Sequence, residues 1–172
     1  MAHAMTRDLP SFDVERFRVP LRFTDIDAMG HVNHARYLAF CEEHRTRMFA
    51  RMDSQCSDGS MSVGAVVARL ECNFYRQIFY DYGEVEVACS VTDIGRSSFT
   101  LRYQIRGDSA LCAELLAVIV RVDKRGQPQL LTPSQRAWLK ERALPRPDPS
   151  SCARPMESPP VDVPTSARGR VT

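Results

Sequence analysis

The sequence predicts an α+β domain in which one long helix lies on one face of an antiparallel sheet. One strand-like stretch and one long helical stretch come first, within residues 16–52. Four apolar or alternating runs then follow between residues 63 and 122, and the turns that separate them are short enough for antiparallel hairpins. A small sheet of this kind leaves its second face and an edge exposed, so we expect the chain to dimerise.

The first part of the chain supplies one strand and the long helix. In residues 16–23, apolar side chains alternate with polar or basic ones, as in a half-buried strand. In residues 33–52, apolar side chains recur at helical spacing, and at about 1.5 Å per residue such a helix crosses a small sheet completely. The run at 53–62 is rich in Ser, Asp and Gly, which predicts a loop after the helix.

The second part of the chain predicts the remaining strands, at residues 63–75, 84–92, 97–106 and 111–122. The second and third runs alternate in polarity, so each has one dry face. The fourth run is nearly continuous in apolar residues, which predicts a central strand covered on both sides. Thr132, Pro133 and Gln135 then form a helix start, with a hydroxyl at the N-cap, proline at N1 and glutamine at N3.

We therefore divide the chain into three parts. Residues 1–15 show no periodicity and form a loose lead-in, and residues 16–144 form the domain. Residues 145–172 hold seven of the eleven prolines with Ser and Arg, a composition that predicts disorder. A length of 172 residues with 44% hydrophobic content suits one domain with a real core.

Composition also excludes several classes of protein. The net charge of +2 comes from nearly balanced acids and bases, and no basic block with interleaved aromatics is present, so we expect no nucleic-acid partner. No stretch reaches the roughly 20 apolar residues that span a membrane, and the first residues lack a signal-peptide core, so we expect a cytoplasmic protein. Six cysteines without a CxxC pair indicate core thiols rather than disulfides or zinc.

The richest chemistry lies at residues 22–37, which we call the polar loop. It joins the first predicted strand to the long helix and concentrates acids, imidazoles, an amide and a glycine: Asp25, Asp27, Gly30, His31, Asn33 and His34. If the helix begins at Asn33, the first amides, at residues 33–35, lack intrahelical acceptors and form an oxyanion site at the positive end of the helix dipole.

Asp27 is the candidate that acts on a carbonyl held by those amides. Gly30 lets the loop turn sharply, which brings the Asp27 carboxylate towards the carbon of a carbonyl whose oxygen rests on the helix start. The structural alternative is that Asp25 or Asp27 only caps the helix or ties the turn together.

The two histidines have several interpretations. With an aspartate they resemble a partial metal site, but no third convincing ligand stands at a characteristic spacing, so we expect no metal. We expect His31 to close the loop by a hydrogen bond and His34 to orient water or shuttle a proton. A surface or capping histidine is the alternative for His34.

Residues 16–142 resemble the hotdog-fold acyl-CoA thioesterases of the 4-hydroxybenzoyl-CoA thioesterase group. The resemblance rests on the pattern D-x-D-A-M-G-H-V-N-x-A-R-Y at residues 25–37. In that family the second aspartate is the catalytic carboxylate, which implies Asp27 here. Tol-Pal-associated thioesterases carry a histidine seven residues later, where His34 stands, whereas many long-chain acyl-CoA thioesterases carry asparagine, so both subgroups stay open.

The resemblance also implies an assembly and a substrate site. A five-stranded sheet wraps around the helix, and two subunits join their sheets as a homodimer, possibly a tetramer, with active sites at the interface. Gly64 would bring backbone close to the thioester across that interface, and Arg96, Ser97 and Ser98 would lie near the phosphates of coenzyme A. No cofactor is expected, because coenzyme A is part of the substrate.

The function implied is hydrolysis of a fatty or related acyl-CoA to free acid and CoA. A thiol with a pKa of about 8.5 leaves with little acid assistance, so a lone carboxylate suffices, as a nucleophile that forms an anhydride or as a base that deprotonates water. Hotdog hydratases and dehydratases are one alternative, but their D-x-N-P-x-H places histidine five residues after the aspartate, where this chain has Val32. A non-catalytic acyl-CoA-binding protein is the other, and intact Asp27 and Gly30 disfavour it.

Overall fold

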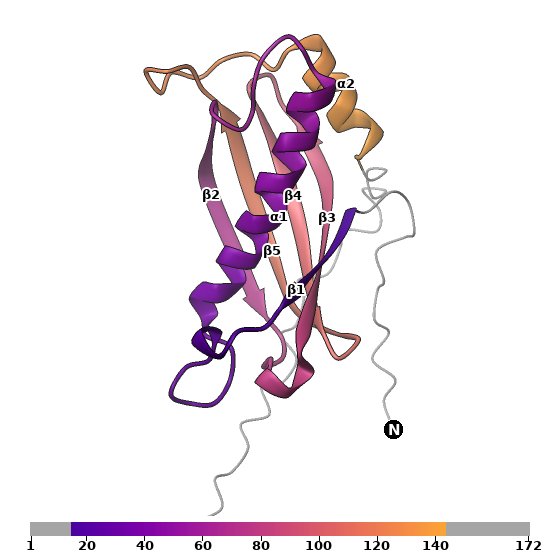
Figure 1. The fold of residues 1–172 in the computed structure, drawn as a ribbon. Coiled ribbons are helices and arrows are strands. Elements are labelled where there is room, and N and C mark those ends of the chain that lie inside the picture. The colour runs from indigo at the N-terminus through magenta and orange to yellow at the C-terminus, as the bar shows by residue number, and fades with distance from the viewer. Residues whose placement is uncertain (1–14, 144–172) are drawn as a thin grey trace, which may run out of the picture.

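The computed structural model describes residues 15–143, which form a five-stranded antiparallel sheet with a long helix packed against it (Figure 1). The strand order is β1-β3-β4-β5-β2. The elements in chain order are β1 (Glu15–Pro20), η1 (Phe23–Asp25), α1 (His34–Gln55), β2 (Ala65–Phe74), η2 (Tyr80–Tyr82), β3 (Glu84–Ile94), β4 (Ser98–Gly107), β5 (Ala110–Arg121) and α2 (Pro133–Glu141). This is the predicted hotdog fold.

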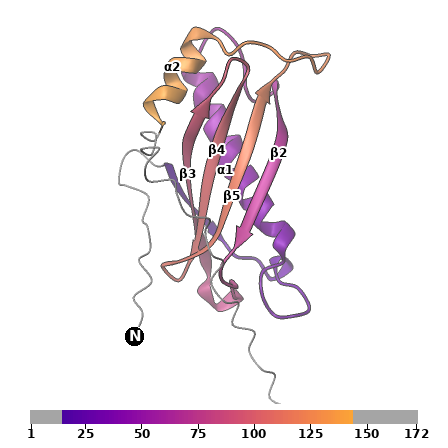
Figure 2. The same ribbon diagram turned by 180° about the vertical axis from the view of Figure 1, so that it is seen from behind.

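The long helix lies along one face of the sheet and runs the length of its strands (Figure 1), and the reverse view shows the other face with α1 behind it (Figure 2). Asn33 is the N-cap, and its side chain accepts a hydrogen bond from the amide of Ala35 at 2.9 Å, so the predicted start is confirmed. The helix ends at Gln55, three residues beyond the predicted end.

The core lies between α1 and the sheet. Alternate residues of β4 point into it and are almost completely buried: Phe99, Leu101, Tyr103 and Ile105. The facing side of α1 contributes a second buried set: Tyr37, Phe40, Cys41, Met48, Phe49 and Met52. Alternation in the strands and helical spacing in α1 therefore produce the layer that the sequence predicts.

The first predicted strand is corrected in length. We expected it to span residues 16–23, but β1 ends at Pro20 and a 3-10 turn occupies Phe23–Asp25. The cause is the carboxylate of Asp25, which accepts a hydrogen bond from the amide of Arg22 at 2.8 Å and so winds the chain tightly.

The expectation of a central, fully covered fourth run is also wrong. β5 lies between β4 and β2, and β4 occupies the centre of the sheet. Leu116 lies on the face of β5 opposite α1, where it is 38% exposed. No described helix covers that part of the face, because α2, the other helix among the described residues, packs at β3.

Contacts at the two ends of α1 show the direction in which β2 runs. At the start of α1, the rings of Tyr37 and Phe74 meet edge to face with centroids 5.1 Å apart. Near the end of α1, the carboxylate of Asp53 accepts a hydrogen bond from the amide of Met61 at 2.6 Å. Because Met61 precedes β2 and Phe74 ends it, β2 runs antiparallel to α1.

The terminal helix follows its sequence signals. The side chain of Thr132 accepts a hydrogen bond from the amide of Gln135, and the Gln135 side chain accepts one from the amide of Thr132, as predicted. Trp138 packs in the core and donates to Gln55 at 2.6 Å.

The five described cysteines are free thiols and four are buried, which confirms core thiols for these residues; they are Cys41, Cys56, Cys72, Cys89 and Cys112. Cys152, the disorder expected at 145–172 and most of the lead-in lie outside the described residues. Glu15, which the prediction assigned to the lead-in, belongs to β1. Among residues 15–143, no helix is long and apolar enough to cross a membrane.

Candidate active site

The polar loop folds into a small hairpin before α1 begins. The amide of Gly30 donates to the carbonyl of Asp27 at 3.0 Å, and the amide of Asp27 donates to the carbonyl of His31 at 3.0 Å. Gly30 has a φ of 84°, in the left-handed region that glycine adopts without strain. The turn expected from this glycine is therefore present.

The carboxylate of Asp27 is held from two sides. Its Oδ1 atom accepts a hydrogen bond from the amide of Met29 at 2.8 Å, and its Oδ2 atom lies 3.5 Å from Nδ1 of His31. The side chains of Asp27 and His31 are 23% and 18% exposed, respectively. The Oδ1 atom is thus fixed by the loop backbone, while the Oδ2 atom keeps lone pairs that can accept a further hydrogen bond.

Asp25 is the structural aspartate of the pair. Its side chain is 1% exposed, and its two oxygens accept hydrogen bonds from the amide of Arg22 at 2.8 Å and from Nε of Arg36 at 2.7 Å. Its own carbonyl accepts the amide of Asn33 at 2.9 Å. All of these partners are within the protein, so Asp25 ties the loop together and its carboxylate is not available to a substrate.

The start of α1 offers one free amide donor instead of the three expected. The amide of Asn33 is taken by Asp25, and the amide of Ala35 is taken by the Asn33 side chain. The amide of His34 has no acceptor among residues 15–143, and it lies at the positive end of the helix dipole. Of the three amides expected to be free, that of His34 is therefore the one without a partner among the described residues.

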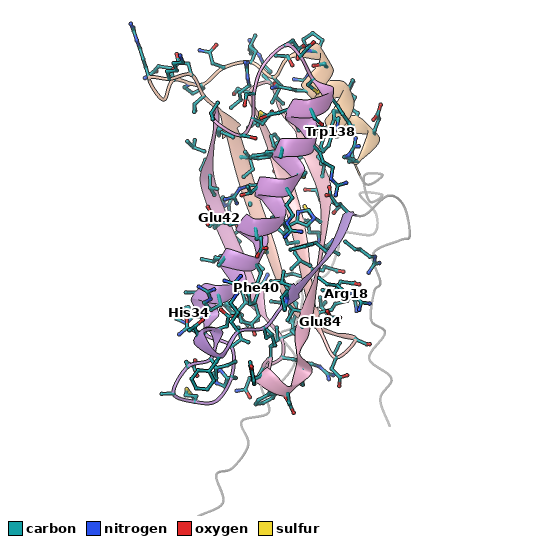
Figure 3. All side chains as sticks on the ribbon, viewed as in Figure 1. Arg18, His34, Phe40, Glu42, Glu84 and Trp138 are labelled. Atoms are coloured by element: carbon teal, nitrogen blue, oxygen red, sulfur yellow. The ribbon has the colours of Figure 1, made fainter. Side chains whose placement is uncertain are left out.

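The structure places the two histidines differently. His34 stands exposed at the first position of α1 (Figure 3), and its imidazole makes no hydrogen bond or ion pair with the described part of the chain. His31 is the histidine beside Asp27. The sequence indicated His31 only as a loop-closing residue; the signal that points to it is the Gly30 turn, which brings residues 27 and 31 opposite each other.

The remaining predicted site residues lie at the other end of the subunit. The carbonyl of Gly64 accepts the amide of Val122, and the carbonyl of Arg96 accepts the amide of Leu131. Both contacts are at the end of α1 where Asp53 meets Met61, far from Asp27. Within the chain, Asp27 therefore lies apart from Gly64 and from the turn that holds Arg96, Ser97 and Ser98.

Gly64 is required by local packing. A Cβ atom at this position would lie 2.9 Å from the carbonyl oxygen of Ser60 and 3.1 Å from that of Val122. Backbone atoms do not move aside as a flexible side chain does, so the close approach of the chain selects glycine.

Four of the described cysteines are poor candidates for a nucleophile. Burial raises the pKa of the Cys72 thiol to about 11, and burial also raises the thiol pKa of Cys41, Cys89 and Cys112. A thiol with a raised pKa is a poor source of thiolate. No group of three or more metal-ligating side chains is assembled within residues 15–143. Asp27 is thus the reactive group that the geometry favours.

Comparison with known proteins agrees with the fold. Residues 21–149 match the model of the thioesterase-like superfamily, which covers more than half of the chain. The chain belongs to the thioesterase-like superfamily. A thioesterase from Thermus thermophilus, solved in complex with coenzyme A and Zn, is 33% identical, with a TM-score of 0.65 over 75% of this chain and 98% of that one.

Two further proteins are similar to this chain, one in fold and one in sequence. A predicted thioesterase from Bacillus stearothermophilus has a TM-score of 0.68 at 24% identity, covering 78% of this chain and 99% of that chain, and so shares the fold. The uncharacterized protein YsmA of Bacillus subtilis (strain 168) is 29% identical over 110 residues, which are 62% of this chain and 71% of the relative.

Proposed function

We propose that this member of the superfamily hydrolyses the thioester of a fatty or related acyl-CoA to the free acid and CoA. The observation that carries the proposal is that the polar loop holds two groups with free hydrogen-bonding capacity: the Asp27 carboxylate, of which one oxygen accepts from Met29, and the His34 amide, which has no acceptor among the described residues. A carboxylate and an oxyanion donor are the two groups that acyl transfer requires. The thioesterase from Thermus thermophilus with bound coenzyme A supports a CoA ester as the substrate.

The chemistry assigned to Asp27 follows from its hydrogen bonds. Since Oδ1 accepts from Met29, Oδ2 is the oxygen that attacks the thioester carbon or removes a proton from water. In the first route the C–S bond breaks, thiolate leaves, and water then hydrolyses the anhydride; in the second, hydroxide displaces thiolate, which receives the proton. The thiol leaves readily in both routes, and neither needs a cofactor. We propose a cytoplasmic enzyme, which suits five free thiols.

We further propose that the active enzyme is a homodimer joined through β2. This strand is one edge of the sheet, and its Leu70 and Phe74 are 45% and 48% exposed. A long apolar edge strand is a template for pairing with a second chain. In a two-fold antiparallel pairing of β2 with its copy, the Gly64 end of one subunit lies beside the Phe74 end of the other.

This pairing accounts for the distribution of the site residues. Asp27 lies at the Phe74 end of its own subunit, whereas Gly64 and the turn with Arg96, Ser97 and Ser98 lie at the opposite end. Across the dimer axis, the partner subunit's Gly64 would approach the polar loop. The partner's Arg96, Ser97 and Ser98 would then supply contacts for the CoA phosphates.

The decisive experiment is thiol release from short, medium, long and aromatic acyl-CoAs by the wild type, Asp27→Asn and Asp81→Asn. Asp81 is an exposed aspartate of η2 and serves as the matched control. We expect Asp27→Asn to lose at least about a hundredfold in kcat, the scale of a removed acid or base, with unchanged circular dichroism. Near-normal turnover by folded Asp27→Asn would refute the assignment.

Two results would replace the proposal altogether. Loss of enoyl-CoA absorbance without thiol release would identify a hydratase. Saturable binding of acyl-CoA without any reaction would identify a non-catalytic binding protein.

A further inference from the structure

The buried carboxylate of Asp25 and the partly exposed side chain of Arg36 form a junction within the polar loop. Asp25 Oδ1 lies 2.7 Å from Nε of Arg36, and Asp25 Oδ2 lies 2.8 Å from the amide of Arg22. The carbonyl of Asp25 accepts the amide of Asn33 at 2.9 Å. A single residue thus joins Arg22, at the start of the polar loop, to the N-cap and to the first turn of α1.

Both chemical groups of the proposed site are attached to this junction. Asp27 follows Asp25 by two residues, and His34 follows Asn33 directly. Ile26 and Val32 pair between the junction and the hairpin, so the loop projects from a base whose two strands are fixed. The distance between the Asp27 carboxylate and the His34 amide therefore depends on the Asp25 contacts.

We propose that Asp25, held by Arg36, is a positioning residue for thioester hydrolysis. It fixes the distance and orientation of the Asp27 carboxylate relative to the His34 amide. The inference rests on the proposed function. Asp25 itself does not touch the substrate, because it is 1% exposed and both of its oxygens have protein donors. Its effect is geometric, and a misplacement of about 1 Å in an active site costs about a hundredfold in rate.

The test compares Asp25→Asn with Glu114→Gln. Glu114 is the matched control, since it is also a buried carboxylate that accepts from an arginine, Arg102 at 2.5 Å, and from Gln104 at 2.9 Å. It lies on β5, and its hydrogen-bond partners all lie outside the polar loop. Both substitutions remove one buried charge and should lower the melting temperature.

Only Asp25→Asn should lower turnover. We expect kcat to fall about tenfold to a hundredfold with KM within about twofold of wild type, because the defect is in transition-state geometry and not in CoA binding. Arg36→Gln should lower kcat similarly, and the double variant should lose no more than the stronger single variant, since the two residues act as a unit. Equal kcat in Asp25→Asn and Glu114→Gln would overturn the positioning role.

A second readout separates this inference from the proposed function. Hydrogen exchange at the amides of Met29, Gly30 and Asn33 should be faster in Asp25→Asn and unchanged in Glu114→Gln. If the wild type releases no thiol from any acyl-CoA, the proposed function fails, and exchange still decides whether Asp25 orders the loop. If the wild type is active, Asp27→Asn is inactive and Asp25→Asn keeps full kcat, the function stands and the positioning role falls.

Discussion

The Nδ1 atom of His31 lies 3.5 Å from the Oδ2 atom of Asp27, across a turn closed by two backbone hydrogen bonds. The imidazole thus faces the carboxylate oxygen that Met29 leaves free. In a Michaelis complex this ring can hold the orientation of the carboxylate or share the proton of an attacking water. For His34, by contrast, we propose a contribution through its backbone amide at the first position of α1.

This difference predicts unequal effects of two matched substitutions. His31→Gln should lower kcat by about tenfold or more, because Asp27 loses its imidazole neighbour. His34→Gln should stay within about threefold of wild type, because the amide that polarises the carbonyl is retained. Steady-state kinetics with the best acyl-CoA measures both. A larger loss for His34→Gln would transfer the proton-handling role to His34.

Gly30 provides a test of the turn itself. Gly30 and Gly126 have φ values of 84° and 77°, and a Cβ at either position would meet no atom within 4 Å. Alanine at either position should therefore cost a similar free energy of unfolding, about 1 to 2 kcal/mol, from backbone strain alone. Only Gly30→Ala should also lower kcat, since only Gly30 shapes the loop that carries Asp27. Urea unfolding measures the loss of stability, and thiol release measures kcat. Equal activity of the two variants would contradict a role of the Gly30 turn in placing Asp27.

Local signals account for what the sequence predicted well. Asn33 at the cap, Gly30 in the turn and Thr132 in the capping box act within a few residues of themselves, so their patterns are visible in the sequence. The 3-10 turn at Phe23–Asp25 was missed because the alternation of apolar and polar residues continues to Phe23 and hides the local hydrogen bond from the amide of Arg22 to the Asp25 carboxylate.

The arrangement of the site depended on long-range order. The sequence assigned Asp27, Gly64 and Arg96 to the same site. Their positions follow only from the strand order and from the antiparallel course of α1 and β2, which put Gly64 and Arg96 at the end of the chain's fold opposite Asp27. The apolar run at 111–120 indicated burial without saying which face would be covered, and Leu116 is partly exposed. Such pairings are set by packing across the whole chain.

Stability should fall at mildly acidic pH because of His44. Burial lowers the pKa of this histidine; the Glu15 carboxylate and carbonyl oppose the shift, and Arg51 and Arg47 add to it. The unfolded chain, with a histidine pKa of about 6.5, then binds a proton that the folded chain resists, so the free energy of unfolding decreases as pH falls below about 6.5.

His44→Gln should remove that dependence between about pH 6.5 and pH 5, because glutamine does not titrate. The pKa values of Asp53 and Glu114 are lowered, so the stability that these carboxylates contribute is lost only at more acidic pH, below their unfolded pKa values. Urea unfolding at a series of pH values measures the slope. An unchanged slope in His44→Gln would show that another group causes it.

The exposed edge of β2 gives the last prediction. Leu70→Glu places a charge on the apolar edge that we propose joins two subunits, and burying that charge in an interface is unfavourable. The variant should therefore be monomeric by light scattering and lose most of its thiol release, because Asp27 no longer meets the partner subunit's Gly64. Leu130→Glu is the control, since Leu130 is also exposed but lies outside β2. A monomeric Leu70→Glu variant with full activity would mean that one subunit holds a complete site; a dimeric variant would move the interface away from this edge.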